Sequence, residues 1–342
     1  MNVVKKKPRV AVIGATGAVG RELVSILEQR SFVCESLSLF ASSKNKGKKI
    51  PFRGSELEIK ELPNAPDQLA WSDFDLAFFT AGSRISEGFV PAAVNAGVFS
   101  IDNASLFRLN EGVPLIVPEV NADKVSGSLV ANPNCTTAQL VVALKPIHDL
   151  FELEEVIVTS FQAVSGAGQK GIDEFLSQVG SEKKQSKVFP HPIVYDCIPQ
   201  IDSFREDGFT GEEYKVIAES KKILGLPTLK VTATCVRVPV LNGHSESVWV
   251  KTKKNIDLKL LRNRFDEFSG IKYLDDPTQN KYPLAQMASG TDPVYIGRLR
   301  MDPNRSDALL MWVVSDNLRK GAALNAVQIA ETALEKRLVF RS

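Results

Sequence analysis

The segment RVAVIGATGAVGRELVSILEQR, residues 9–30, constrains the fold more than any other part of the chain. A short run of β-branched residues ends in three glycines spaced three residues apart, Gly14, Gly17 and Gly20. Beyond them, apolar residues recur at helical spacing. This order predicts a buried strand, a glycine turn and an amphipathic helix, which together form the opening unit of a doubly wound parallel sheet.

The rest of the chain predicts two domains. Further strand-like runs, mostly separated by polar or helix-capable segments, favour a parallel sheet in the first 133 residues. Later strands are longer and alternate more strictly, and Asn242–Gly243 predicts a hairpin between two of them. We therefore predict an α/β protein with a Rossmann-type domain over 1–133, completed by a helix over 318–342, and an α+β domain with a largely antiparallel sheet over 134–317. The predicted strands of the first domain are ESLSLFA (35–41), FDLAFFTAG (74–82), GVFSIDN (97–103), PLIVPEV (114–120) and SLVANPN (128–134).

Charge and cysteine usage narrow the class of partner. The 342 residues include 42 basic and 40 acidic ones spread along the chain, giving a net charge of +2. This balance argues against nucleic acid or membrane as a partner and favours a small molecule. The four cysteines lie far apart and form no C-x-x-C pair, so we expect no metal site, no disulfide framework and a reducing, cytoplasmic setting.

The glycine turn predicts a dinucleotide site. Glycines at a strand-to-helix turn let the backbone approach a phosphate, whose charge the helix N-terminus favours. The second strand ends in LFASSKNKGKK, where Ser42, Lys44 and Lys46 stand without the carboxylate that holds a ribose 2′-hydroxyl. We therefore expect NADP, although these lysines also fit a solvated loop. Ala81-Gly82 ends a later strand and faces the same cofactor, unless it is an ordinary turn.

Cys135 is the candidate nucleophile. It follows an Asn-Pro-Asn turn and stands where a helix begins, a position that lowers the pKa of a thiol. The amide of Asn134 could donate to an oxyanion. A buried packing role remains the alternative for Cys135.

The chain offers three histidines as proton-transfer partners for this thiol. His148 lies about three helical turns beyond Cys135, too far along the helix to share a site with it. His191 lies between prolines in an expected loop. His244 opens a strand, and the predicted hairpin would place it next to Arg237, as an acid/base group beside a carboxylate-binding one.

Seven motifs, in order, resemble those of the aspartate-β-semialdehyde dehydrogenase family. They are GATGAVG, PLIVPEVN, NPNCTT, QAVSGAG, GEEYK, CVRVPVLNGH and DNLRKGAALNAVQIAE. The resemblance covers almost the whole chain. It implies a glyceraldehyde-3-phosphate-dehydrogenase-like fold and the NADPH-dependent reductive dephosphorylation of 4-phospho-L-aspartate to L-aspartate 4-semialdehyde. This step leads to lysine (through diaminopimelate), threonine and methionine.

The resemblance also implies roles for individual residues. Cys135 would form a thioester, His244 would act as general acid/base, and Gln162 would orient the intermediate. The substrate-binding residues would be Arg237 for the carboxylate, Glu213 for the ammonium group, Arg108 and Lys215 for the phosphate, and Asn134. The cofactor-binding residues would be Gly14, Thr16, Gly17, Ala18, Val19, Ser42, Lys44, Ala81, Gly82, Ser165, Gly166 and Asn317.

Some points stay open at this stage. Many relatives have Ser-x-Arg-Ser where this chain has Ser42-Ser43-Lys44-Asn45, and lysine lacks the planar fork of arginine, so we expect a preference for NADP without exclusivity. The resemblance also implies a homodimer that forms through the sheet of the second domain. The alternatives are a reductase for another acyl phosphate, such as N-acetyl-γ-glutamyl phosphate, and a catalytically inactive NADP-binding relative.

Overall fold

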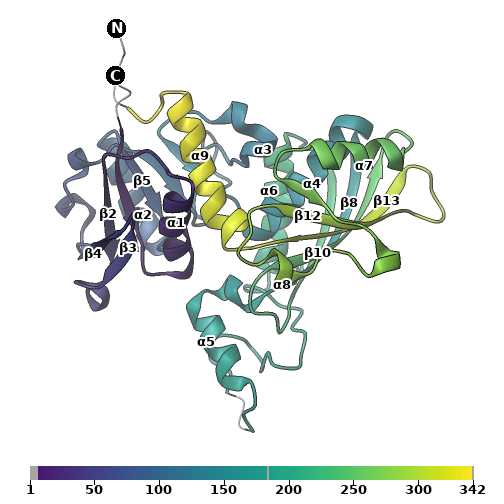
Figure 1. Ribbon diagram of the computed structural model, residues 1–342, viewed down its shortest axis with the longest axis horizontal. Coiled ribbons are helices and arrows are strands. Elements are labelled where there is room, and N and C mark those ends of the chain that lie inside the picture. The colour runs from purple at the N-terminus through teal and green to yellow at the C-terminus, as the bar shows by residue number, and fades with distance from the viewer. Residues whose placement is uncertain (1–6, 183–184, 341–342) are drawn as a thin grey trace. The chain divides into compact units, whose positions relative to one another are not determined.

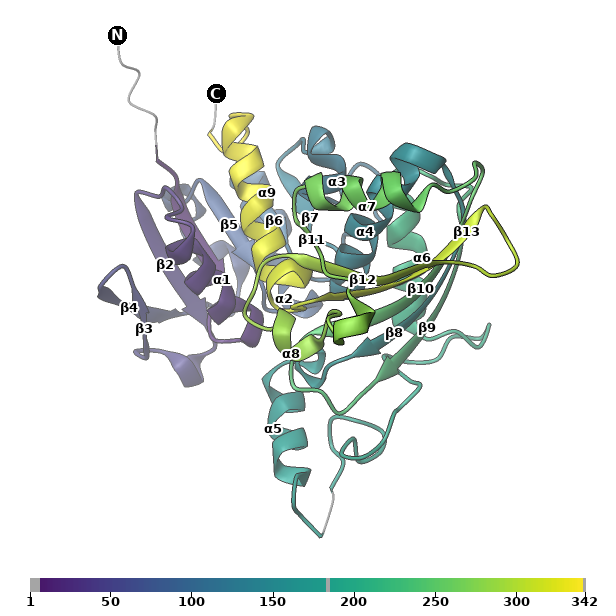
Figure 2. The ribbon, with the colours of Figure 1, turned by 45° about the vertical axis from the view of Figure 1, so that its right-hand side comes forward.

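The computed structural model describes residues 7–182 and 185–340, and the chain divides into two compact units. One unit comprises Met1–Pro133 together with Ala322–Ser342, and the other comprises Asn134–Gly321. Figures 1 and 2 show the ribbon from two directions. Because the units are separate bodies, each is described by itself.

A seven-stranded sheet forms the centre of the first unit, in the order β3-β4-β2-β1-β5-β6-β7. All neighbouring pairs are parallel except the antiparallel pair β3 and β4. The strand order reverses at β1, which makes the carboxyl end of β1 the topological switch point where such sheets bind ligands. The strands are β1 (Arg9–Ile13), β2 (Ser36–Ala41), β3 (Lys49–Phe52), β4 (Ser55–Glu61), β5 (Leu76–Phe79), β6 (Phe99–Asp102) and β7 (Leu129–Ala131).

Helices cover both faces of this sheet, and β1 shows why its sequence is continuously apolar. Val10 and Val12 point into a core that α1 and α9 complete, whereas Ala11 and Ile13 point into a second core that α2 completes. A strand that is buried on both faces has no polar side to present. The helices of this unit are α1 (Ala18–Gln29), α2 (Ser83–Asn95), α3 (Pro118–Asn121) and α9 (Leu324–Glu335), with the short 3-10 helices η1 (Ser43–Asn45), η2 (Pro66–Gln68), η3 (Trp71–Asp73) and η4 (Ala122–Lys124).

Two local predictions in this unit differ from the structure. The predicted strand PLIVPEV forms only an isolated bridge at Leu115 before α3 begins, because Asn121 ties the turn by accepting from Val117 N and donating to Leu115 O. The hairpin of β3 and β4 was not predicted, since β4 is mostly charged. Its two-residue turn, Arg53–Gly54, has positive φ at both positions, which suits the twist of paired strands.

The second unit contains a six-stranded mixed sheet in the order β11-β12-β13-β10-β8-β9, in which three of the five neighbouring pairs are antiparallel. The helices α4, α6 and α7 contact its strands, and Figure 2 shows them on the same side of the sheet. The strands are β8 (Leu153–Gln162), β9 (Lys230–Arg237), β10 (His244–Thr252), β11 (Ile271–Tyr273), β12 (Val294–Met301) and β13 (Ala308–Ser315). The helices are α4 (Cys135–Phe151), α5 (Gln169–Gln178), α6 (Gly211–Leu224), α7 (Leu258–Glu267) and α8 (Ala285–Ala288), with η5 (Val164–Ala167) and η6 (Pro277–Gln279). The π-helical turn η7 (Arg319–Ala323) begins in this unit, and its last two residues belong to the first unit.

The predicted hairpin at Asn242–Gly243 is wrong, because β8 lies between β9 and β10. β9 runs parallel to β8, so the chain leaving β9 must pass across the end of β8 before it turns back as β10. Along this crossing, Val240 O and Leu241 O accept from the N–H groups of Val164 and Ser165. β8 and β9 therefore end, and β10 begins, at one edge of the sheet.

The second unit also extends further along the chain than the predicted boundary at residue 317. Residues 318–321 belong to it and not to the C-terminal segment of the first unit. The reason is local bonding, since Asp316 Oδ1 accepts from the N–H groups of Leu318 and Arg319, and Arg319 also pairs with Asp292 at 2.6 Å.

Candidate active site

Cys135 is the first residue of α4, and Asn134 is its N-cap. The Asn134 Oδ1 atom accepts from Thr136 N at 2.9 Å and from Thr137 N at 3.2 Å, which satisfies two of the N–H groups that a helix start leaves unpaired. The Asn-Pro-Asn turn thus builds the helix start and places the sulfur at its electropositive end.

Two carboxylates of α6 hold the cap residue. Glu219 Oε2 accepts from Asn134 N at 2.7 Å, and Glu212 Oε1 accepts from Asn134 Nδ2 at 2.8 Å. The side-chain amide that was expected to donate to an oxyanion therefore already donates to Glu212. Both polar atoms of the Asn134 side chain are therefore engaged, Oδ1 by the start of α4 and Nδ2 by Glu212, and this fixes the backbone just before Cys135.

His244 is the described histidine that reaches Cys135. Its Nε2 atom lies 3.3 Å from Cys135 Sγ, and its Nδ1 atom accepts from Ala163 N at 3.1 Å. The ring is fully buried, and burial together with the Arg237 guanidinium holds the pKa of His244 well below its usual value. By contrast, His148 lies in the last turn of α4 and His191 is exposed.

Arg237 and Gln162 complete this edge of the sheet, where they are paired in the register of β8 and β9. Arg237 Nη1 donates to Ala163 O at 2.7 Å, and Gln162 Nε2 donates to Glu212 Oε1 at 3.2 Å. Burial lowers the pKa of the Arg237 guanidinium, and the Glu212 carboxylate opposes that shift. Four of the predicted residues, Cys135, Gln162, Arg237 and His244, thus meet at one end of the sheet.

Two glycines allow this crowding. A Cβ atom on Gly166 would lie 2.6 Å from Arg237 Nη1 and 3.2 Å from His244 Nε2, and one on Gly321 would lie 2.7 Å from Cys135 Cβ. Real Cβ atoms essentially never come within 3.0 Å of such a neighbouring heavy atom, so the 2.6 Å and 2.7 Å contacts would force a shift. The sequence gives no sign of Gly321, because it lies far from Cys135 along the chain.

Glu213, the predicted ammonium ligand, is engaged by the backbone of the second unit. Its Oε2 atom accepts from Thr210 N at 2.7 Å in the capping box of α6, and its Oε1 atom accepts from Cys235 N at 3.0 Å. Both oxygens are therefore bound to the protein's own backbone. The preceding residue, Glu212, instead contacts the side chains of Asn134 and Gln162.

Glu212 is buried and ionised. Burial tends to raise the pKa of its carboxyl, but Lys215, Asn134 and Arg237 outweigh burial and hold this pKa below its usual value. Lys215 Nζ lies 3.1 Å from Glu212 Oε2 and 2.9 Å from Asp202 Oδ2. These two carboxylates raise the pKa of Lys215 despite burial, so the lysine keeps its charge.

Glu246 is a buried acid that was not predicted. It follows His244 by two residues on β10, and neither of its oxygens has a hydrogen-bond partner of normal geometry within residues 7–182 and 185–340. Burial raises the pKa of its carboxyl well above the usual 4.5, and the Gln139 amide offsets this only in part. Burial therefore favours the protonated form of Glu246, two residues beyond His244 on β10.

The raised pKa of Glu246 predicts a pH-dependent stability cost. Above pH 4.5 the unfolded chain loses this proton while the folded chain keeps it, so folding is destabilised as the pH rises toward the folded-state pKa. Glu246→Gln should remove the cost. The difference in unfolding free energy, variant minus wild type, should grow by up to about 1.4 kcal/mol per pH unit in urea titrations at pH 5, 6 and 7. Parallel pH curves for the two proteins would show that Glu246 is ionised in the folded state.

Three residues that were predicted to contact the cofactor lie together in the second unit. Ser165 Oγ lies 2.9 Å from Asn317 Nδ2, and Gly243 N donates to Asn317 Oδ1 at 2.9 Å. Gly166 follows Ser165 in η5. The two side chains are thus held in fixed positions beside the crossing that leads to His244.

The glycine turn of the first unit fits a dinucleotide phosphate. A Cβ on Gly14 would lie 2.8 Å from Ala81 N, and one on Gly20 would lie 2.2 Å from Gly14 O, so both glycines serve close packing. Gly17 differs, since the nearest atom to its Cβ position, Gly14 O, is 3.5 Å away. Gly17 is also the N-cap of α1 and provides no side-chain cap. The start of α1 therefore presents backbone N–H groups beside open space, as an anion requires.

The remaining predicted cofactor residues lie at the same edge of the first unit. Thr16 Oγ1 accepts from Asn45 Nδ2 at 3.2 Å, which ties the glycine turn to η1. Ser42 precedes η1, and Lys44 within η1 is exposed. Gly82 is the N-cap of α2 with a φ of 86°, a value that favours glycine. Ala18 and Val19 begin α1, and Ala81 precedes Gly82.

Arg108, the predicted phosphate ligand, is a buried residue of the first unit. Its Nε atom donates to Asn132 O at 2.9 Å and its Nη2 atom donates to Asn103 O at 2.7 Å. These bonds fix the plane of the guanidinium.

Among the helices of the described residues, none combines the length and the apolar character that crossing a membrane demands.

Comparison with known proteins gives the class first. The family described as "Semialdehyde dehydrogenase, NAD binding domain" matches residues 9–128, and the family described as "Semialdehyde dehydrogenase, dimerisation domain" matches residues 144–320. Fold, cysteine site and these matches define a two-domain semialdehyde dehydrogenase, an oxidoreductase with a nicotinamide-nucleotide-binding domain. The predicted fold class is confirmed.

Relatives along the whole chain give the particular family. Aspartate-semialdehyde dehydrogenases from Aquifex aeolicus (strain VF5) and Bacillus subtilis (strain 168) are 44% and 42% identical, over 97% and 96% of this chain and 99% and 98% of theirs. The crystal structure of aspartate semialdehyde dehydrogenase II from Vibrio cholerae, complexed with ASA, matches with a TM-score of 0.92 at 39% identity, over 96% of this chain and 99% of that one. The enzyme with NADP from Candida albicans matches with a TM-score of 0.76 at 25% identity, over 97% of this chain and 100% of that one. The chain belongs to the aspartate-semialdehyde dehydrogenase family, which confirms the resemblance seen in the sequence.

Proposed function

We propose that this protein catalyses the reversible, NADPH-dependent conversion of 4-phospho-L-aspartate to L-aspartate 4-semialdehyde and phosphate. The observation that carries the proposal is Cys135 at the start of α4, with its sulfur 3.3 Å from His244 Nε2, in a chain of this family. A thiolate at a helix N-terminus is a nucleophile suited to an acyl phosphate.

The protein's own residues explain the first half of the reaction. The Cys135 sulfur attacks the acyl carbon, the bond from that carbon to the phosphate oxygen breaks, and phosphate leaves with the electron pair, so that a thioester remains. NADPH, when bound, supplies the hydride that reduces this thioester. Gln162, which Glu212 holds in place, is positioned to orient the acyl group beside the sulfur.

Substrate recognition follows from the charges at this edge. We assign the substrate's α-carboxylate to Arg237, whose guanidinium suits a bidentate carboxylate. The ammonium group is assigned to Glu212 in place of Glu213, because only Glu212 faces the site. Arg108 and Lys215 remain the proposed phosphate ligands. This assignment rests on the family resemblance, and the carboxylates beside Lys215 mean that phosphate must compete for it.

The Cys135 site disfavours an inactive relative, since the cysteine, His244, Gln162 and Arg237 are all present and brought together. A reductase for N-acetyl-γ-glutamyl phosphate is disfavoured as well, because the acetylated amine of that substrate has no positive charge for the buried Glu212 carboxylate to bind.

The test follows NADPH absorbance in the reverse direction. Protein mixed with L-aspartate 4-semialdehyde and NADP should form NADPH only when inorganic phosphate is added. N-acetyl-L-glutamate 5-semialdehyde serves as the competing substrate. Phosphate-dependent turnover of that compound alone would replace the proposed substrate, and no turnover of either one, with NADP still bound, would favour the inactive relative.

We propose NADP as the preferred cofactor, because the loop after β2 presents Lys44 and no carboxylate. The value of kcat/KM should be higher for NADPH than for NADH, and Lys44→Ala should lower this ratio about fivefold, the effect of one exposed charge contact. Lys49→Ala is the matched control, since Lys49 pairs with Glu56 on the neighbouring strand. Equal kcat/KM values for the two cofactors in wild type would contradict the proposal.

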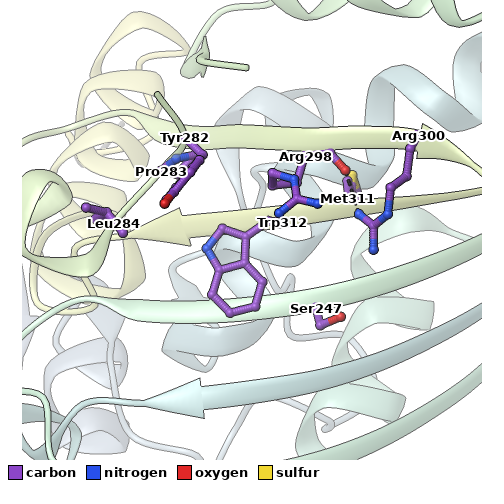
Figure 3. Close-up of a pocket in the computed structure, with 8 residues that line it drawn as sticks. All are labelled: Ser247, Tyr282, Pro283, Leu284, Arg298, Arg300, Met311 and Trp312. Atoms are coloured by element: carbon purple, nitrogen blue, oxygen red, sulfur yellow. Dashed lines mark hydrogen bonds between the residues drawn. The ribbon is translucent and has the colours of Figure 1, made fainter. Parts of the chain in front are cut away.

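We also propose a homodimer formed through the sheet face opposite α4, α6 and α7. Ile157 of β8 is 44% exposed, and a cavity of about 460 Å³ opens beside Trp312. Figure 3 shows the Trp312 ring between Ser247 and the Tyr282–Leu284 segment. A sheet face with exposed aliphatic and aromatic side chains, in a domain that matches a dimerisation family, is suited to bind a second copy.

The dimer predicts a defined effect of a charge on this face. Ile157→Glu should shift the mass measured by light scattering at micromolar concentration from dimer to monomer, because a buried unpaired carboxylate is costly. Leu260→Glu is the matched control, since Leu260 is similarly exposed, at 47%, but lies on α7. A monomeric mass for wild type would refute the dimer. An unchanged mass for Ile157→Glu would show that the dimer interface does not include Ile157.

A further inference from the structure

Lys215 lies between two carboxylates that the protein fixes to different degrees. Its Nζ atom is 3.1 Å from Glu212 Oε2 and 2.9 Å from Asp202 Oδ2. The Glu212 side chain is 7% exposed, and its Oε1 atom accepts from two side-chain amides of the site. The Asp202 side chain is 45% exposed, and its Oδ1 atom accepts from the next backbone N–H, that of Ser203, at 2.8 Å. The Asp202 carboxylate can therefore turn out to water, whereas Glu212 is buried and bound at both oxygens.

The loop before α6 aims the Asp202 carboxylate at the lysine. Asp202 has a φ of 71°, a left-handed conformation that aspartate adopts more readily than most residues. Gly211 N donates to Ser203 O at 2.9 Å, which closes the loop onto the first turn of α6. A Cβ atom on Gly211 would lie 2.7 Å from Asp202 Oδ2, so this glycine leaves the space that the carboxylate occupies. The ion pair with Lys215 is thus built into the backbone of the loop.

This ion pair occupies a cation that the proposed reaction needs for phosphate. Interactions with Lys215 hold the pKa values of both carboxyls below their usual values despite burial, so both groups are ionised at neutral pH. Lys215 contributes one positive charge and the two carboxylates contribute one negative charge each, so the three groups together carry a net charge of −1. An approaching phosphate is repelled as long as the Asp202 carboxylate stays beside the lysine.

We propose that Asp202 is a displaceable counterion of Lys215 that sets the affinity of the site for phosphate. In the substrate-free protein, Asp202 holds the lysine in place. When phosphate binds, it takes the position of the Asp202 carboxylate, which turns out to water. When phosphate leaves after the thioester has formed at Cys135, the carboxylate returns to Lys215 and opposes rebinding. This inference rests on the proposed role of Lys215 as a phosphate ligand, but not on the identity of the acyl group.

Two variants test this competition in different ways. Asp202→Asn removes the negative charge, keeps an acceptor for Ser203 N and tolerates the positive φ. Gly211→Ala keeps the charge but places a methyl group where the carboxylate lies, and so pushes it away from Lys215. Asp196→Asn is the matched control, since Asp196 is also exposed and its Oδ1 atom likewise accepts from the N–H of the next residue, at 2.7 Å.

The probe is inorganic phosphate, and its Kd is measured by ³¹P NMR titration of the substrate-free protein at pH 7. We expect Kd to fall about two- to fivefold in Asp202→Asn and in Gly211→Ala, the effect of removing one half-exposed ion pair that competes for the lysine. Asp196→Asn should leave Kd unchanged. An aspartate that only supported the loop would give the opposite sign, because its loss would leave Lys215 less well placed and would weaken phosphate binding.

A Kd that stays the same or rises in either folded variant would overturn the proposal. An equal fall in Asp202→Asn and Asp196→Asn would also overturn it, because that result would indicate a general effect of net charge. Urea titration shows whether each variant is folded, and if Asp202→Asn does not fold, Gly211→Ala decides alone.

Lys215→Met separates this inference from the proposed reaction. If it leaves the phosphate Kd unchanged while wild type still oxidises L-aspartate 4-semialdehyde in the presence of phosphate, the role of Asp202 is rejected and the reaction stands. If wild type shows no turnover while Kd changes as expected in the Asp202 and Gly211 variants, the reaction is rejected and the role of Asp202 stands.

Discussion

Cys135→Ser should lower kcat/KM for the phosphate-dependent oxidation of L-aspartate 4-semialdehyde by roughly 10⁴- to 10⁶-fold, the usual loss when a covalent nucleophile is removed. The serine hydroxyl is close in shape to the thiol, but at neutral pH it is almost fully protonated and is a much weaker nucleophile than a thiolate. The kcat/KM values of the variant and of wild type should be measured by following NADPH absorbance at saturating NADP.

The matched control for this variant is Cys197→Ser, which changes an exposed cysteine of the same unit. Its kcat/KM should remain within about twofold of wild type, as is usual for exposed positions away from a site. Urea titration should show that both variants are folded. Near-normal turnover by the Cys135→Ser protein would show that Cys135 is not a covalent nucleophile and that its role is packing.

The sequence predicted those parts of the fold in which neighbouring residues determine the outcome. The strand before Gly14, the glycine turn and α1 follow directly from local pattern, because β1 is buried on both faces and α1 buries one. The link between β9 and β10 could not be obtained in this way. Asn242–Gly243 is a strong local turn signal, but β8 pairs with both strands and separates them, and that pairing depends on residues about 80 positions earlier in the chain.

The site shows the same division between local and distant information. Cys135 could be identified from its turn and helix start, since its cap and its dipole come from adjacent residues. The sequence predicted that Arg237 and His244 lie close together, but it did so through a hairpin that does not exist. They are close because β9 ends and β10 begins at the same edge of the sheet. Ala163 could not be identified at all, because a backbone group leaves no mark in the choice of side chain.

The choice between Glu212 and Glu213 could not be made from the sequence either. Successive helical residues point about 100° apart, so two adjacent glutamates on α6 face different surroundings. Which of them faces the site depends on the rotation of α6, and the capping box at Thr210 fixes that rotation by engaging Glu213. The motif GEEYK alone does not distinguish which of the two glutamates faces the site.

This difference predicts opposite effects for two conservative variants. Glu212→Gln should raise KM for L-aspartate 4-semialdehyde and lower kcat/KM by about 10- to 100-fold, because it removes the negative charge that is assigned to the substrate's ammonium group and that helps hold Asn134 and Gln162. Glu213→Gln should leave kcat/KM within about threefold of wild type. It should lower the unfolding free energy by about 1–2 kcal/mol, because its amide NH₂ group would oppose one of the two backbone donors at Thr210 and Cys235.

The two variants control for each other, since they make the same chemical change one residue apart in the same helix. Steady-state kinetics and urea titration on both proteins separate a binding role from a structural one. If Glu213→Gln lost substrate affinity while Glu212→Gln did not, α6 would present its other carboxylate to the substrate, and the capping box would have to open when substrate binds. If both variants lost only stability, neither glutamate would bind the ammonium group. Recognition of the amino acid would then rest on Arg237 alone, and the enzyme should accept the deaminated substrate, succinate semialdehyde, with a kcat/KM close to that for L-aspartate 4-semialdehyde.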